Sequence, residues 1–111
     1  MTVYIDKPTT YPKEAIAPKA LYYGRVWSHL WADSLDELHA FARRIGLKRD
    51  WFQNRPNFPH YDVTPAKFQI ALTAGAQYTD LQTWLREHRP DLLAKPEDAP
   101  TQPPLFDSSE R

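Results

Sequence analysis

The placement of proline constrains this chain most, because proline fixes φ and removes a backbone hydrogen-bond donor. The chain has eleven prolines in 111 residues. Pro8, Pro12 and Pro18 interrupt residues 7–24, which we therefore expect to lack regular structure and to form a binding lid or a draped segment. Four more prolines stand in an acidic, polar stretch after Lys95. We predict one compact domain over residues 1–94 and a flexible, proline-rich acidic tail over residues 95–111.

Between these stretches, apolar residues recur with the periods of strands and helices. The predicted strands cover residues 2–5, 26–32, 47–53 and 60–63. The predicted helices begin at three N-caps, Ser34, Thr64 and Thr79, and the first helix places Leu35, Leu38, Phe41, Ala42 and Ile45 on one face. Alternating strands and helices predict an α/β fold with a small, single-layer, partly parallel sheet of three to four strands and about three helices.

Composition excludes several classes of function. The chain has no cysteine, so disulfides, thiolate metal sites and a cysteine nucleophile are excluded. It has no run of about 18 apolar residues, so we expect no membrane partner. The first residues, Met-Thr-Val-Tyr-Ile-Asp, show neither a basic leader nor an apolar signal segment. We therefore expect a cytoplasmic protein.

Residues 27–62 hold three of the four histidines, among carboxylates and aromatic side chains. In parallel α/β sheets, ligands bind beyond the carboxyl ends of the strands. Asp6, Asp33 and Gln53 each end a predicted strand, so we expect them to meet at one rim. The candidate ligand-binding residues are Asp6, His29, Asp33, His39, Arg49, Trp51, Gln53, His60, Tyr61 and Asp62.

The first hypothesis is binding of a nucleotide-like or phosphate-bearing molecule, or of single-stranded nucleic acid. An aromatic ring such as Trp51, Tyr61 or Trp31 would stack on a base, while Arg49 and neighbouring cations attract phosphate. A structural role without any ligand is a further hypothesis, since buried tryptophan and histidine often only satisfy hydrogen bonds within a core.

The catalytic alternative to ligand binding is a metal-dependent phosphoesterase or nuclease, in which a divalent cation activates water. The possible ligands are His29, His39, His60, Asp6, Asp33 and Asp62. Of these, His60 and Asp62 lie two residues apart on an extended segment, about 7 Å from each other on one face, and Asp6 would be their further ligand. His29 and Asp33 would lie about 13 Å apart on one strand, which is too far to share an ion. The sequence leaves the cofactor open, with a divalent metal as the candidate.

The tail carries a separate motif, Gln102-Pro103-Pro104-Leu105-Phe106. It resembles the short bacterial sliding-clamp-binding motif, in which glutamine anchors one end and Leu-Phe fills an apolar pocket. The resemblance implies an adaptor whose partner is a sliding clamp, bound through Gln102, Leu105 and Phe106. In the alternative, Leu105 and Phe106 pack back onto the domain or onto a second copy. The oligomeric state stays open.

Several segments together resemble one family of small bacterial and phage proteins, the domain of unknown function number 4031. They include Val-Tyr-Ile-Asp at 3–6, His-Leu-Trp-Ala-Asp-Ser at 29–34, Glu-Leu-His-Ala-Phe-Ala at 37–42, Ile-Gly-Leu-Lys-Arg-Asp-Trp-Phe-Gln at 45–53, Pro-His-Tyr-Asp at 59–62 and Ala-Gly-Ala at 74–76. The family brings no activity to transfer. The resemblance implies that its motif includes Asp6, His29, Asp33, His39, Gln53, His60 and Asp62.

Overall fold

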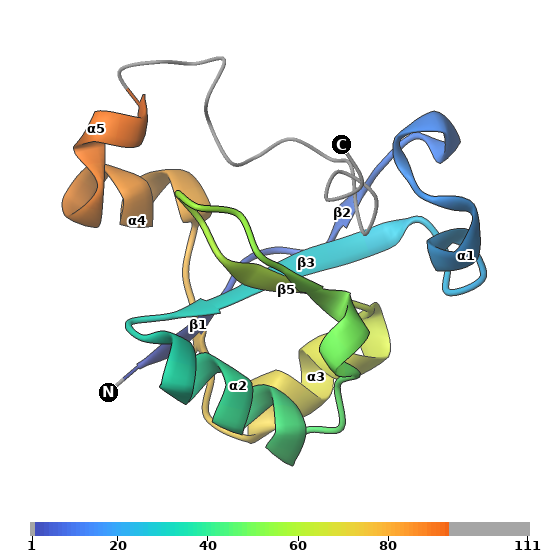
Figure 1. The fold of residues 1–111 in the computed structure, drawn as a ribbon, viewed down its shortest axis with the longest axis horizontal. Helices are drawn as coiled ribbons and strands as arrows, with labels where there is room; N and C mark the ends of the chain where they lie inside the picture. Colours follow the sequence, from blue (N-terminus) through green and yellow to red (C-terminus); the bar gives the residue numbers. More distant parts are fainter. Residues whose placement is uncertain (1, 94–111) are drawn as a thin grey trace.

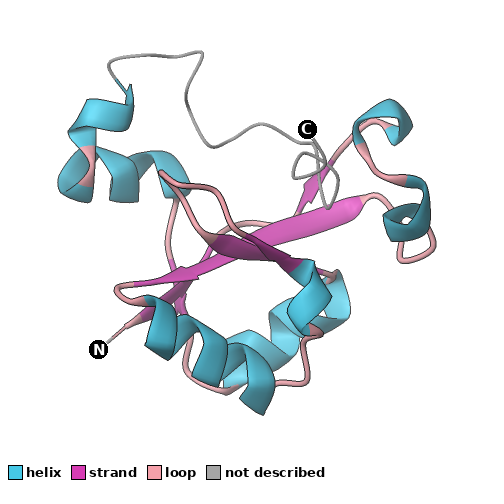
Figure 2. Ribbon diagram, in the orientation of Figure 1, coloured by secondary structure: helices cyan, strands magenta, loops and turns pink. Residues whose placement is uncertain are grey.

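The computed structural model describes residues 2–93, in which short strands and helices alternate (Figures 1 and 2). The first half of the chain forms β1 (Val3–Ile5), β2 (Thr9–Thr10), the 3-10 helix η1 (Lys13–Ala15), α1 (Pro18–Leu21), β3 (Val26–Ala32) and α2 (Leu35–Arg44). The second half forms the 3-10 helix η2 (Arg49–Trp51), β4 (Phe52–Gln53), β5 (His60–Val63), α3 (Pro65–Thr73), β6 (Gln77–Tyr78), α4 (Leu81–His88) and α5 (Pro90–Leu93).

The strands form one mixed sheet in the order β4-β5-β3-β1-β6, with β2 paired to β3. The pair of β1 and β6 is parallel, and the other pairs of the described residues are antiparallel. The predicted α/β fold with a partly parallel sheet is therefore confirmed. The predicted element counts are too low, because residues 2–93 form six strands and five α-helices. Strands of two residues, such as β2, β4 and β6, show no alternation that a sequence pattern can reveal.

The central strand β3 separates two kinds of packing. Leu30 belongs to the main core, which fills the face covered by α2 and α3. Trp27 and Trp31 point to the other face, where each joins a small core of its own. Trp31 packs beneath α4 and α5, whereas Trp27 packs beneath η1 and α1. The part of this face around His29 therefore lies between two apolar clusters.

The predicted helices form where their caps indicate, with two differences. Ser34 Oγ accepts a hydrogen bond from the Glu37 amide at 3.2 Å and so starts α2 as predicted, although Leu35 at its first position is exposed. The predicted cap at Thr79 is wrong. Asp80 caps α4, because its carboxylate accepts the Thr83 amide at 3.0 Å and carries a charge that the helix N-terminus favours.

Two other predictions are wrong. Residues 47–53 form η2 followed by the two-residue β4 instead of one strand. Residues 7–24 are not structureless, because their prolines begin short helices: Pro12 is the N-cap residue of η1 and Pro18 is the first residue of α1. Proline suits these positions because their amides would have no helical partner. The segment packs onto the sheet through Trp27.

Within residues 2–93, no helix is long and apolar enough to cross a membrane. The predicted tail at 95–111, with the clamp-like residues Gln102, Leu105 and Phe106, lies outside the described residues.

Candidate metal centre

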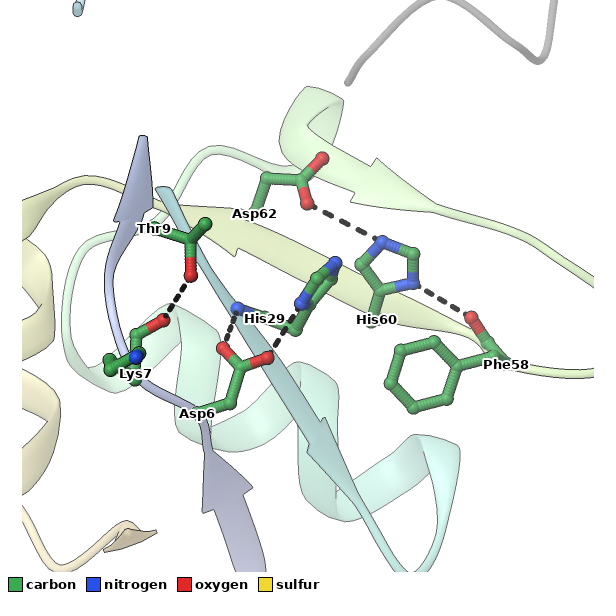
Figure 3. A network of polar contacts seen from close by, with 7 residues as sticks. All are labelled: Asp6, Lys7, Thr9, His29, Phe58, His60 and Asp62. Atoms are coloured by element: carbon green, nitrogen blue, oxygen red, sulfur yellow. Dashed lines mark hydrogen bonds and ion pairs between the residues drawn. The ribbon is translucent and has the colours of Figure 1, made fainter. Parts of the chain in front are cut away.

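The register of three neighbouring strands brings four polar side chains together. His29 on β3 lies directly opposite Asp62 on β5, and cross-strand partners point to the same face. His60 precedes Asp62 by two residues and shares that face. On the other side of β3, Ile5 pairs with Leu30, which places Asp6 beside His29. Figure 3 shows the four side chains gathered over the middle of the sheet.

Asp6 fixes the ring of His29. One Asp6 oxygen accepts the backbone amide of His29 at 2.6 Å, and the other lies 2.8 Å from His29 Nδ1 (Figure 3). Because a carboxylate only accepts, Nδ1 carries the proton in this contact. The second ring nitrogen, Nε2, is then left as the lone-pair donor of the neutral imidazole.

His60 is held in the same manner by the backbone. Its Nδ1 lies 2.8 Å from the carbonyl oxygen of Phe58, which also only accepts. Its ring stacks against the Phe58 ring with centroids 4.9 Å apart. His60 Nε2 is therefore the free nitrogen, and it lies 3.4 Å from Asp62 Oδ1.

Asp62 is the least satisfied polar group of the cluster. Its side chain is 0% exposed, and neither carboxylate oxygen has a hydrogen-bond partner. Burying a carboxylate in this state is costly unless a positive charge lies beside it. The 3.4 Å contact of His60 Nε2 with Asp62 is an ion pair when both ring nitrogens carry protons (Figure 3). When Nε2 carries none, it and the Asp62 oxygen present lone pairs to each other. A cation between them would satisfy both.

The distances suit one metal ion. One ligand atom from each of His29, His60 and Asp62 lies within 4.8 Å of the others, and this is the one such group found among residues 2–93. The three residues are 4%, 5% and 0% exposed. Histidines that ligate metals typically donate their other ring nitrogen to a carboxylate or a backbone carbonyl, as His29 does to Asp6 and His60 does to Phe58.

The electrostatics around the cluster are set by its carboxylates. Burial is the largest single effect on the pKa of His29 and lowers it. The hydrogen bond to Asp6 and the charges of Asp6 and Asp62 together outweigh burial, so the pKa of His29 is raised above its usual value. The nearby charge of Arg55 acts in the lowering direction. Burial and the same two carboxylates raise the pKa of Tyr11 to about 12, which keeps this phenol protonated. Tyr11 and Arg55 therefore lie within electrostatic reach of the candidate metal ligands.

The expected rim of Asp6, Asp33 and Gln53 does not form. Because β1 and β3 are antiparallel, Asp6 lies beside His29 whereas Asp33 lies beside Thr2, at opposite ends of the pair. Asp33 is exposed and accepts a hydrogen bond from Tyr4 Oη at 2.9 Å. Gln53 pairs with His60 across β4 and β5, so it is buried on the face of the cluster.

Other predicted site residues lie on different surfaces. His39 Nδ1 contacts Tyr61 Oη at 2.8 Å on the face covered by α2 and α3. Burial and the charge of Arg49 lower the pKa of His39. Arg49 lies over the Phe52 ring, 5.5 Å from its centroid, and Trp51 lies at the end of the sheet near α1. These residues do not share a pocket with the histidine cluster.

The sequence hypothesis named His29, His39, His60, Asp6, Asp33 and Asp62 as possible metal ligands and favoured His60, Asp62 and Asp6 among them. The structure groups His29, His60 and Asp62 and places Asp6 behind His29. The missing information is the antiparallel register of β3 and β5. The ends of single strands do not reveal that register, and the spacing within one strand relates His29 only to Asp33.

The comparisons with known proteins place the chain in a family. The model of the family described as protein of unknown function (DUF4031) matches residues 3–90. The chain belongs to the DUF4031 family. The match spans all four residues of the cluster in this DUF4031 protein. No curated protein and no solved structure matched it.

Proposed function

We propose that this protein is a metal-dependent phosphoesterase that binds one divalent cation through His29, His60 and Asp62. One observation carries the proposal: a fully buried Asp62 carboxylate without hydrogen-bond partners faces two histidines whose Nδ1 atoms are already engaged. Without a cation this arrangement costs free energy. With a cation, every ring nitrogen and the carboxylate gain a partner.

The ligand set favours a transition metal. Two imidazoles and one carboxylate suit Zn²⁺, and also Fe²⁺, Co²⁺ or Mn²⁺, better than Mg²⁺ or Ca²⁺, which prefer oxygen ligands. Three protein ligands leave at least one coordination position for water or substrate, as in catalytic zinc sites. The absence of cysteine in the chain means that no thiolate competes for the ion.

A metal at this position supplies hydrolytic chemistry. A divalent cation lowers the pKa of a bound water toward 7 and so generates a hydroxide nucleophile at neutral pH. Arg55 lies close enough to His29 for its charge to lower the pKa of that histidine. A guanidinium within electrostatic reach of a metal favours the binding of phosphate oxygens, so the preferred substrate is a phosphate ester.

In this proposal, the nucleotide-like ligand expected from the sequence would bind to the metal through its phosphate. The base-stacking and phosphate-attracting residues suggested by the sequence, Trp51 and Arg49, lie away from the cluster. The second candidate function is therefore binding of a phosphate-bearing ligand at the metal without turnover. It is favoured by the deep burial of the three metal ligands.

Metal loading and turnover test the proposal in sequence. The protein is stripped with EDTA, reloaded separately with Zn²⁺, Mn²⁺, Co²⁺ and Mg²⁺, and assayed for bound metal by mass spectrometry and for hydrolysis of bis(p-nitrophenyl) phosphate. We expect one transition-metal ion per chain and metal-dependent release of p-nitrophenol. Stoichiometric metal without turnover of this ester or of mononucleotides would leave the second candidate and exclude the hydrolase. No retained metal would overturn both.

Two histidine variants give the matched control. His60→Ala removes a ligand, so the bound metal and the turnover should both be lost. His88→Ala removes an exposed imidazole on α4 whose Nδ1 contacts the carbonyl of Trp84. This variant should keep full metal content and activity. Equal loss of metal in the two variants would mean that metal binding does not depend specifically on the buried cluster and would contradict the proposal.

A further inference from the structure

A cleft of about 440 Å³ lies between α1 and η2. It is lined by Lys19, Ala20, Tyr23, Lys48, Asp50 and Trp51. The two segments lie 30 residues apart in the sequence, so the cleft exists only in the folded domain. The sequence pattern predicts ligand binding by Trp51 and by the cations around Arg49, but it does not connect them with α1.

Two of the lining residues, Tyr23 and Trp51, belong to a row of aromatic rings that contact one another edge to face. The Tyr22 and Tyr23 rings lie 5.0 Å apart, Tyr23 lies 5.0 Å from Trp51, and Trp51 lies 6.2 Å from Trp27. Tyr22 is 85% exposed and Tyr23 is 37% exposed, which is unusual for neighbouring aromatic side chains. The row therefore runs from a solvent-exposed ring to a buried one on β3.

The charge around the row is mainly positive. Lys19 and Lys48 line the cleft. Two further exposed cations are close in the sequence to its two segments: Arg25 follows α1, and Arg49 begins η2. Arg25 Nε donates to the Tyr11 carbonyl, which fixes its side chain beside β2. Asp50 is the acidic residue among the lining side chains. Alternating aromatic rings and cations is the pattern with which proteins bind unpaired bases and their phosphates.

We propose that this surface binds single-stranded nucleic acid, which is then the substrate class of the phosphoesterase. The cleavage part of this inference rests on the proposed function, whereas the binding part does not. Stacking favours a single strand over a duplex, because the faces of paired bases are already covered by their neighbours. Lys19 and Lys48 would meet the phosphates on either side of a stacked base.

The surface and the metal centre lie on the same side of the sheet. Trp27 and His29 are two residues apart on β3, so they share a face and their Cα atoms lie about 7 Å apart. Trp27 is buried beneath η1 and α1, so bases would stack at the exposed Tyr22 end of the row, and the strand would continue over the surface toward the candidate metal. There the metal-bound hydroxide would attack phosphorus, and the bond from phosphorus to the ester oxygen would break. One water is consumed: one of its protons goes to solvent when the hydroxide forms, and the other goes to the leaving oxygen, so the products are a phosphate monoester dianion and a free hydroxyl.

Fluorescence anisotropy of a labelled dT12 oligonucleotide, measured in EDTA, tests the binding part with the full-length protein. We expect saturable binding that weakens as salt rises. Tyr22→Ala should weaken it at least about fivefold, since base stacking on one ring is typically worth that much or more. Because Tyr22 is so exposed, this variant should keep its fold. The double variant Lys19→Gln and Lys48→Gln should weaken binding and flatten the salt dependence.

Matched controls lie on other surfaces. Tyr78→Ala removes an exposed tyrosine on β6, and Arg86→Gln removes an exposed cation on α4. Both should leave dT12 binding unchanged. Binding that is absent, or as tight to a duplex hairpin as to dT12, or insensitive to Tyr22→Ala and to the lysine double variant, would overturn the inference.

The His60→Ala variant separates the two proposals. It should bind dT12 in EDTA like the wild type but cleave nothing after metal is added. Binding of dT12 by a wild-type protein that retains no metal supports the surface and overturns the phosphoesterase. Metal-dependent hydrolysis of bis(p-nitrophenyl) phosphate without dT12 binding supports the phosphoesterase and overturns the surface.

Discussion

Replacing Asp62 by asparagine should stabilise the metal-free protein while removing its capacity to bind metal. The Asp62 side chain is 0% exposed, and neither of its oxygens has a hydrogen-bond partner. Asparagine has nearly the same volume and no charge, so it removes the desolvation penalty without opening a cavity. Its amide can also donate to His60 Nε2, which lies 3.4 Å from the present carboxylate oxygen.

The magnitude follows from the burial and from the missing partners. A buried, unsatisfied polar group costs about 1–3 kcal/mol, and a charged one costs more. The charge of Asp62 favours protonated His29, which offsets part of this penalty. We therefore expect the free energy of unfolding of the metal-free variant to rise by about 1–3 kcal/mol. Saturation at 100 times the dissociation constant should stabilise the wild type by about 2.7 kcal/mol and leave the variant unchanged.

Urea unfolding followed by tryptophan fluorescence measures both effects, once in EDTA and once in Zn²⁺. In EDTA the variant should have the larger free energy of unfolding. In Zn²⁺ this difference from the wild type should shrink or change sign. Asp33→Asn is the control, because Asp33 is exposed and accepts a hydrogen bond from Tyr4. If Asp62→Asn destabilised the metal-free protein by more than about 1 kcal/mol, the carboxylate would belong to a structural ion pair and the reasoning would be refuted.

The other predictions concern the positioning of the site, the fold and the tail. Asp6→Asn should weaken zinc binding about 10- to 100-fold in a calorimetric titration, and unchanged affinity would show that Asp6 does not position the ligand. Ser34→Ala should cost about 1 kcal/mol in urea unfolding, and a loss near zero would contradict its capping role. Burial and the charge of Arg49 lower the pKa of His39 from 6.5, so the imidazole binds a proton more tightly in the unfolded state than in the folded state. The free energy of unfolding should therefore decrease as pH falls below about 6.5. NMR titration should show a higher His39 pKa in Arg49→Gln, and an unchanged value would exclude Arg49 as a cause. A peptide with the clamp-like motif should bind sliding clamp in an anisotropy assay, and Phe106→Ala should abolish that binding; equal binding of both peptides would contradict the motif.

Local signals predicted the parts of the fold that local physics determines. The capping residue Ser34 and the apolar positions that follow it define α2, and Thr64 with Pro65 defines the start of α3. The buried strand over residues 26–32 was predicted with its observed bounds, because seven residues with few breakers match a strand and not a helix turn. Each of these elements carries its own start, stop or period in the sequence.

Long-range pairing determines what the sequence did not reveal. The metal set depends on the register that places His29 opposite Asp62, and this register joins residues that are 33 positions apart in the sequence. The assumption of parallel strands moved Asp33 to the site, although the antiparallel pair of β1 and β3 places it at the far end. The prolines of residues 7–24 predict irregular structure only if proline acts as a breaker, whereas proline also begins helices.

The coordination of a bound metal tests the central claim most directly. X-ray absorption at the zinc edge, recorded on protein loaded with one Zn²⁺ per chain, reports the first shell of ligands. Two imidazoles from His29 and His60 with Zn–N distances of about 2.0–2.1 Å, together with oxygen ligands, are the expected result. Loss of one imidazole from the zinc shell of the His60→Ala variant would identify His60 as one of the two imidazole ligands. A first shell without imidazole, or a spectrum that His60→Ala leaves unchanged, would contradict the proposed metal centre.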